Sequence, residues 1–137
     1  MRVFVDTSTL FKKYVDEHGS LEFDRILDEA SELIVSPLTR IEMHSALAKC
    51  VREKILSRDQ AEKLKAEIKK DFSFYSCVYW NESLEEKSVE IVQKFTLKTL
   101  DAVQLAAGIL SKADMFVTSD KRLFDEARRV IKKIYFA

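Results

Sequence analysis

Glycine is nearly absent from this chain of 137 residues, which contains only Gly19 and Gly108. Loops that cradle nucleotide phosphates need several closely spaced glycines, as in Gly-x-x-x-x-Gly-Lys-Ser/Thr or Gly-x-Gly-x-x-Gly. Neither pattern can be built from two glycines so far apart. The sequence therefore argues against the familiar nucleoside-triphosphate and dinucleotide chemistries.

Cysteine and histidine are equally scarce. Cys50 and Cys77 form no Cys-x-x-Cys pair and are too few for a disulfide framework. With His18 and His44 they do not make a convincing tetrahedral zinc site. We expect both cysteines to be reduced residues of the core.

Long apolar runs and an excess of one charge are also missing. No run approaches the roughly 20 residues that a membrane helix needs, and five residues before the first acid are too few for a secretory signal. We therefore expect a cytoplasmic protein with no membrane contact. The 23 basic and 23 acidic residues balance, which argues against coating nucleic acid by bulk charge but permits a local basic rim.

What is present is the composition of one folded domain, residues 1–137, with 47% hydrophobic and 34% charged residues. Short β-branched and aromatic runs alternate with amphipathic segments, a pattern typical of a parallel sheet covered by helices on both faces. Predicted strands are residues 2–5, 33–35, 77–80, 115–117 and 133–136. Predicted helices are residues 7–15, 20–30 (with Leu21, Phe23, Ile26 and Leu27 inward), 37–54 (capped by Ser36), 60–70, 82–94, 99–110 and 121–130.

Two acids lie just beyond the ends of predicted strands, at the edge where parallel sheets bind ligands. Asp6 follows the first strand and Asp120 the fourth. Each alone is well explained as a helix N-cap. Ser8 or Thr9 could cap in place of Asp6, and Ser119 in place of Asp120, which would free both carboxylates for another role.

Two further acids lie on predicted helices. Glu42 shares a helix face with Ser45, Lys49, Arg52 and Glu53. That face is either solvated or turned towards the same edge as Asp6. Asp101 and Gln104 are the only polar residues in the otherwise apolar segment 100–110, which indicates a buried helix. Asp101 is either a first-turn acid beside a Thr99 cap or the partner of a cation.

The four acids are expected at one edge of the sheet, and together they indicate more than any one of them alone. Carboxylates gathered at one edge repel each other and raise their own pKa values unless a cation neutralises them. Ligands that are all oxygen favour Mg²⁺ or Mn²⁺. The sequence therefore predicts a metal site at the carboxyl ends of the strands.

Four segments, in order along the chain, resemble the PIN-domain nucleases and in particular the ribonuclease toxins of the VapC type. They are residues 5–10 (VDTSTL), 36–42 (SPLTRIE), 100–106 (LDAVQLA) and 116–123 (FVTSDKRL). The resemblance implies a three-layer α/β/α PIN-like fold with about five parallel strands. It also implies an acidic site of Asp6, Glu42, Asp101 and Asp120, with Thr118 as its hydroxyl companion.

The resemblance further implies a Mg²⁺-dependent endoribonuclease, the toxin of a VapBC-type pair with a VapB-like antitoxin as partner. Gln104 departs from the family, since such toxins often carry His at this position; we expect it to affect substrate contact and not the metal. Because net charge is zero, RNA affinity would depend on local cations, each of which is otherwise an ordinary surface charge: Lys12, Lys13, Lys49, Arg52, Lys98, Lys121 and Arg122.

The predicted reaction is hydrolysis of an RNA phosphodiester by a water activated on Mg²⁺. Asp6, Asp101 and Asp120 would be metal ligands, with Glu42 orienting water or acting as base. Alternatives are an RNA-processing PIN nuclease outside any toxin pair, a phosphatase forming an aspartyl phosphate at Asp6, and a non-catalytic interaction domain. We also expect a homodimer, in which the aromatic residues of 72–80 and 135–136 either form the interface or pack in the core.

Overall fold

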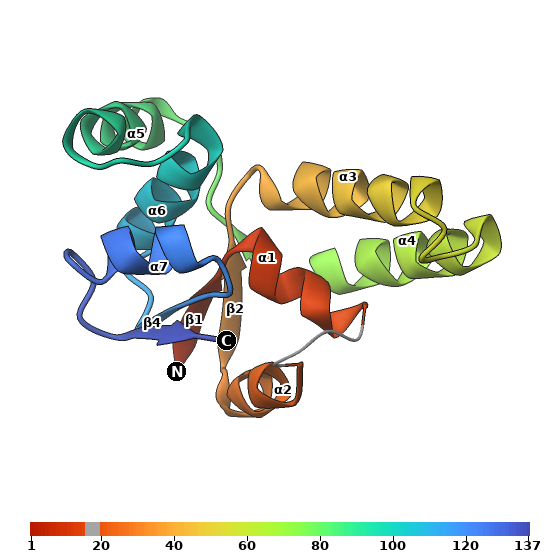
Figure 1. The fold of residues 1–137 in the computed structure, drawn as a ribbon. Coiled ribbons are helices and arrows are strands. Elements are labelled where there is room, and N and C mark those ends of the chain that lie inside the picture. Colours follow the sequence, from red (N-terminus) through yellow and green to blue (C-terminus); the bar gives the residue numbers. More distant parts are fainter. Residues whose placement is uncertain (16–19) are drawn as a thin grey trace.

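The computed structural model describes residues 1–15 and 20–137, so His18 and Gly19 lie outside the described residues. Helices and strands alternate through most of the chain (Figure 1). The strands are β1 Arg2–Val5, β2 Glu32–Val35, β3 Ser76–Cys77, β4 Met115–Thr118 and β5 Ile134–Phe136. The helices are α1 Thr7–Leu10, the 3-10 helix η1 Phe11–Lys13, α2 Ser20–Glu29, α3 Thr39–Arg52, α4 Arg58–Phe72, α5 Glu82–Lys94, α6 Thr99–Ser111 and α7 Lys121–Ala127.

Within the described residues the strands form one five-stranded sheet in the order β3-β2-β1-β4-β5. Every neighbouring pair is parallel, and β1 lies at the centre between β2 and β4. All strands therefore end at the same edge, which places the residues that follow β1 and β4 side by side. The predicted α/β fold with a parallel sheet of about five strands is confirmed.

The sheet separates two hydrophobic cores because alternate strand residues point to opposite faces. Phe4 and Phe116 pack with α5, α6 and α7 on one face. Val3, Val5 and Val117 pack with α1 to α4 on the other. Figure 1 shows this three-layer arrangement, with α5 to α7 on the left of the sheet and α1 to α4 on its right.

One close approach brings α6 onto the sheet. Gly108 faces the stacked rings of Phe4 and Phe116, whose centroids are 5.1 Å apart. A Cβ at this position would overlap the Phe116 ring and lie 3.2 Å from Cδ1 of Phe4. The absence of a side chain at Gly108 therefore sets how closely α6 packs, and α6 carries Asp101 at its start.

Five predicted boundaries or faces are wrong. The helix expected from residue 37 begins at Thr39, because a turn closed by the Thr39 amide and the Ser36 carbonyl (3.2 Å) precedes it. The third strand ends at Cys77 and not at residue 80, since its partner β2 ends at Val35. Leu21 is 80% exposed and does not face the core.

The fourth difference concerns the segment after Asp6. The helix predicted over residues 7–15 is one short α-helix, α1, followed by the 3-10 turn η1. The last helix is also shorter than predicted and ends at Ala127. Among the described residues, no helix has the length and apolar character needed to cross a membrane.

Candidate active site

Asp6 follows β1 and is almost fully buried. Its carboxylate accepts hydrogen bonds from Ser8 Oγ (2.8 Å), Thr118 Oγ1 (2.8 Å), and the amide and hydroxyl of Thr9 (3.2 Å each). Asp6 is thus the N-cap of α1, and the prediction that Ser8 or Thr9 would cap in its place is wrong. Both residues instead donate to the carboxylate and orient it.

Burial controls the ionisation of Asp6. Desolvation raises the pKa of this carboxyl from its usual 3.8 to about 6, although the donors from Ser8, Thr118 and Thr9 act in the opposite direction. An acid that is buried and surrounded only by neutral donors is one that a nearby cation would stabilise strongly.

Asp120 lies beside Asp6 because β4 neighbours β1 in the sheet. Asp120 Oδ1 accepts from the Leu123 amide (3.1 Å) and caps α7. Ser119 does not take this role; its hydroxyl contacts that of Thr9 at 3.0 Å. Thr118 bridges the two acids, since its hydroxyl donates to Asp6 and accepts from the Asp120 amide (3.0 Å).

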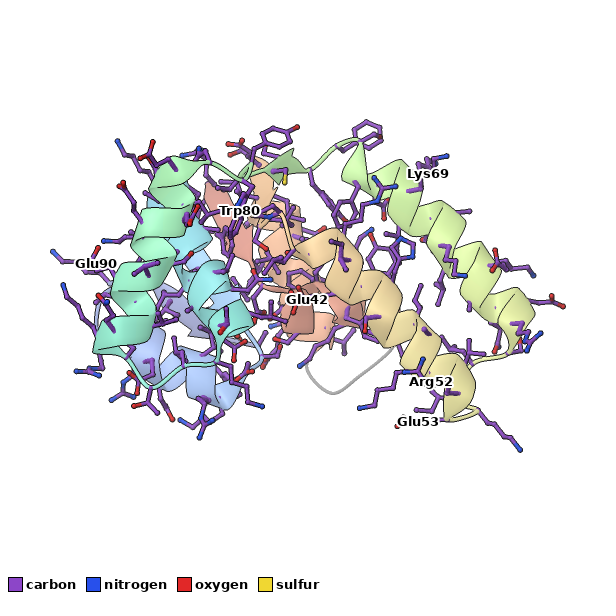
Figure 2. The ribbon with its side chains drawn as sticks, turned by 90° about the horizontal axis from the view of Figure 1, so that it is seen from above. Glu42, Arg52, Glu53, Lys69, Trp80 and Glu90 are labelled. Atoms are coloured by element: carbon purple, nitrogen blue, oxygen red, sulfur yellow. The ribbon has the colours of Figure 1, made fainter. Side chains whose placement is uncertain are left out.

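Glu42 on α3 faces this region and not open solvent. Its Oε1 accepts from Thr7 Oγ1 and from Gln104 Nε2, both at 2.7 Å. The first donor comes from α1 and the second from α6. Figure 2 shows Glu42 in the N-terminal half of α3, on the side towards α6.

Asp101 lies in the first turn of α6, ahead of a run of buried residues. The predicted Thr99 cap is wrong: Lys98 occupies the N-cap position and makes no side-chain hydrogen bond there. Burial raises the pKa of Asp101, and repulsion from Asp120 and then Glu42 raises it further, while Lys98 and Arg122 partly offset the rise. In the described part of the chain the Asp101 carboxylate has no hydrogen-bond partner.

A pocket of about 390 Å³ unites these residues. It is lined by Asp6, Thr7, Ser8, Glu42, Ser45, Ala46, Lys49, Arg52, Leu100, Asp101, Gln104 and Asp120. All four predicted acids are therefore brought together, with Lys49 and Arg52 of the same α3 face. Thr118 is fully buried and acts from beneath the pocket through Asp6.

The other predicted cations lie differently. Lys12 Nζ donates to the carbonyl of Ala137 (3.1 Å), and Lys121 pairs with Asp125 (2.6 Å). Lys13 pairs with Asp71 at 2.6 Å. Lys98 and Arg122 do not line the pocket but are close enough to influence the pKa of Asp101.

The pocket residues fit a divalent cation chemically but do not form a finished ligand cage. Over residues 1–15 and 20–137, no three Asp, Glu, His or Cys side chains are arranged to hold one ion. However, all four acids offer carboxylate oxygens as ligands, which Mg²⁺ and Mn²⁺ prefer. Asp101 has no hydrogen-bond partner among the described residues and is repelled by two other acids, so a cation would stabilise its charged form.

Sequence reasoning missed the hydroxyl groups of Thr7, Ser8 and Thr9 as parts of the site. Their run directly after Asp6 was the available signal, because hydroxyls next to a strand-end acid can donate to it. For Gln104 the sequence predicts an effect on substrate contact. The structure places its amide on Glu42.

Together, the parallel three-layer fold and the acidic pocket at the strand ends define an α/β protein with a candidate metal-dependent site. The sequence profile of the PIN domain matches residues 3–130. The chain therefore belongs to the PIN-domain family.

Solved structures share the fold over nearly the whole chain. A toxin–antitoxin complex from Klebsiella pneumoniae has a chain with a TM-score of 0.72 and 17% identity, covering 98% of this chain and 99% of its own. VapBC2 from Rickettsia felis, bound to a promoter DNA fragment, gives a TM-score of 0.73 at 10% identity, with 100% and 99% covered.

A third neighbour is VapC20 from Mycobacterium tuberculosis, described as a toxin that cleaves the sarcin–ricin loop. It has a TM-score of 0.68 and 16% identity, covering 90% of this chain and 94% of its own. At such identities the likeness concerns the fold alone. No curated protein sequence matches the chain.

Proposed function

We propose that the chain is a metal-dependent endoribonuclease that hydrolyses RNA phosphodiester bonds, with Mg²⁺ or Mn²⁺ as its cofactor, and that residues 1–137 form one domain. The observation that carries this proposal is the convergence of Asp6, Glu42, Asp101 and Asp120 in one pocket. They come from four separate segments of the chain. Helix capping alone explains Asp6 and Asp120 but not Glu42 or Asp101.

In this proposal Asp6, Asp101 and Asp120 hold the cation. When bound, it would lower the pKa of a water and offset charge developing on the phosphate. Thr118 keeps Asp6 and Asp120 in register through its two hydrogen bonds. Glu42, whose Oε1 is held by two donors, orients the attacking water or accepts its proton.

The basic residues support a polyanionic substrate. Lys49 and Arg52 line the pocket about two and three turns further along α3 than Glu42. Figure 2 shows Arg52 towards the far end of this helix. An RNA whose scissile phosphate is at the acids would extend past both cations, and Lys98 and Arg122 add positive charge close enough to Asp101 to lower its pKa.

An antitoxin of the VapB type is the proposed partner. Neighbours with the same fold occur in the K. pneumoniae toxin–antitoxin complex and in R. felis VapBC2. We also propose a homodimer in the cytoplasm, supported by the exposure of Phe74 (78%), Tyr79 (77%) and Trp80 (54%). Light scattering of the purified chain tests the dimer, which a monomer mass would contradict.

Two alternatives make different predictions. A phosphatase acting through an aspartyl phosphate would carry a covalent phosphate on Asp6, and such enzymes usually have a second Asp two positions on, where this chain has Ser8. A non-catalytic interaction domain predicts no change in melting temperature with Mg²⁺. An RNA-processing nuclease outside a toxin pair predicts the same cleavage but no inhibiting partner.

The test is RNA cleavage by the purified chain with Mg²⁺ and with EDTA, repeated for Asp101→Asn. We expect at least about a 100-fold loss of kcat/KM in the variant, equivalent to about 3 kcal/mol of activation free energy. Asp125→Asn is the matched control, since Asp125 pairs with Lys121 outside the pocket. Full activity of Asp101→Asn would refute the site.

A further inference from the structure

Gln104 is a buried amide on α6 that the proposed chemistry does not use. The side chain is 2% exposed, although the residue lines the acidic pocket. Its Nε2 donates to Glu42 Oε1 at 2.7 Å. Longer contacts run from the same nitrogen to Thr7 Oγ1 (3.1 Å) and Thr39 Oγ1 (3.4 Å).

The orientation of this amide is set by Glu42. A carboxylate oxygen only accepts hydrogen bonds, so the reversed amide would place two acceptors against each other. In the observed orientation the other end is left unsatisfied: Gln104 Oε1 is buried without a hydrogen-bond partner in the described structure. Most buried amides have both ends bonded, so the unpaired oxygen of Gln104 calls for an explanation.

Glu42 is the point where three helices meet through polar contacts. Thr7 of α1 and Gln104 of α6 both donate to Oε1 of this residue on α3. Neither donor contacts Glu42 Oε2, and among the described residues no hydrogen bond to Oε2 exists. One carboxylate oxygen is thus clamped while the second stays available to a ligand of the pocket.

We propose that Gln104 is a positioning residue that fixes the Glu42 carboxylate in the acidic pocket, at the cost of its own unpaired Oε1. The inference deepens the proposed function and rests on it where cation binding is concerned. Residues that orient a group of a metal site typically alter metal affinity or activity about 10- to 100-fold when replaced. Gln104 would act in this way through Glu42, whose free Oε2 would hold the cation through a water, and would itself touch neither the cation nor the RNA.

The test variant is Gln104→Met, which keeps an unbranched side chain of similar length but removes the donor. Gln104→His is the rescue variant, because an imidazole N–H can donate at a similar distance from the backbone. Thr39→Val is the control, since it removes a hydroxyl that contacts the same amide but not Glu42. Mn²⁺ is the probe, titrated alone by calorimetry against each folded, metal-free protein.

We expect Gln104→Met to bind Mn²⁺ about 10- to 100-fold more weakly, with its metal-free melting temperature unchanged or raised. Gln104→His should recover most of the affinity, and Thr39→Val should bind as the wild type does. Wild-type affinity of Gln104→Met would overturn the inference, as would a Gln104→His variant no better than Gln104→Met.

A crystal structure of metal-free Gln104→Met separates this inference from the proposed function. We expect the Glu42 side chain to leave the position in which Oε1 contacts Thr7. An unchanged Glu42 overturns the positioning role whether or not the protein binds a metal. A wild-type chain that binds no Mn²⁺ and cleaves no RNA contradicts the proposed function instead.

Discussion

At the residue scale, two opposing effects set the pKa of Asp6. Hydroxyl and amide donors from Ser8, Thr9 and Thr118 stabilise its charged form, yet burial outweighs them and the pKa rises to about 6. Neutral dipoles thus fail to replace the water that the carboxylate loses on folding. The ionised acid remains a destabilising group until a cation reaches the pocket.

The first prediction concerns this acid in metal-free protein. The folded chain keeps the Asp6 proton up to about pH 6, whereas the unfolded chain releases it near 3.8. Stability is therefore lost as the pH rises through this window. Asp6→Asn, which stays neutral, should gain stability relative to the wild type by about 2 kcal/mol between pH 4 and pH 8.

Urea unfolding in EDTA at both pH values measures that difference. Adding Mg²⁺ at pH 8 should stabilise the wild type and leave Asp6→Asn unchanged, which makes the variant its own metal control. An equal stability difference at pH 4 and pH 8 would contradict the origin we assign to the raised pKa.

At this scale the sequence was sufficient to find the acids but not to describe their contacts. Asp6 and Asp120 stand where strands end, a position visible in the residue pattern. Both residues cap a helix and also line the pocket, so capping does not exclude a place in the candidate site. The Gln104–Glu42 bond joins residues 62 apart in sequence, which no local pattern reveals.

At the scale of single elements, α6 is the helix whose packing most constrains the site. Its residues from Ala102 to Gly108 are buried, and Asp101 begins the same helix. Gly108 allows close contact with the rings of Phe4 and Phe116. A shift of α6 away from the sheet would move Asp101 and Gln104 together.

We predict that Gly108→Ala destabilises the protein, by about 1–3 kcal/mol. Alanine would ordinarily favour a helix by up to about 1 kcal/mol over glycine. Here the new Cβ would lie 2.5 Å from Cδ2 of the buried Phe116 ring. Thermal unfolding of Gly108→Ala, Phe116→Leu and the double variant measures the coupling; a stabilised Gly108→Ala would contradict the close packing.

The predicted elements were most accurate where both ends carried a clear signal. For α5, residues 82–94 match, because Asn81 provides the N-cap, accepting from the Leu84 amide at 2.9 Å. The start of α3 was misplaced because Ser36 and Pro37 form a turn that mimics a helix start. The end of β3 depends on where its neighbour β2 stops, and that information lies elsewhere in the chain.

At the scale of the whole molecule, charge is balanced overall but locally arranged. The acids gather in the pocket, and Lys49 and Arg52 continue from it along α3. Binding to RNA should therefore involve few phosphates and depend only moderately on salt. The net charge of zero could not reveal this arrangement.

We predict that Lys49→Ala with Arg52→Ala reduces the salt dependence of RNA binding. Loss of two phosphate contacts on a single strand should lower the slope of log K against log salt by about 1.4. Fluorescence anisotropy in the Asp101→Asn background, which prevents cleavage, measures the slope. Lys63→Ala with Lys69→Ala, both exposed on α4, removes the same charge and should leave it unchanged; equal slopes in both double variants would contradict the proposed RNA path.

The strand order is the part of the fold that the sequence could not supply. Parallel strands and their approximate positions follow from hydrophobic pattern, but the pairing of β1 with β4 joins Val3 to Met115. A family resemblance implied the arrangement; local periodicity did not. The pocket exists only because of that pairing.

The central place of β1 also bears on synthesis. β1 is synthesised before the other four strands of the sheet. Its neighbour β4, with Thr118 and then Asp120, follows more than 100 residues later. Such non-local pairing makes folding slow relative to helical proteins. Until β4 has been synthesised, Asp6 lacks its Thr118 donor and Asp120 is missing from the pocket. A chain released early from the ribosome would therefore lack the complete acidic pocket.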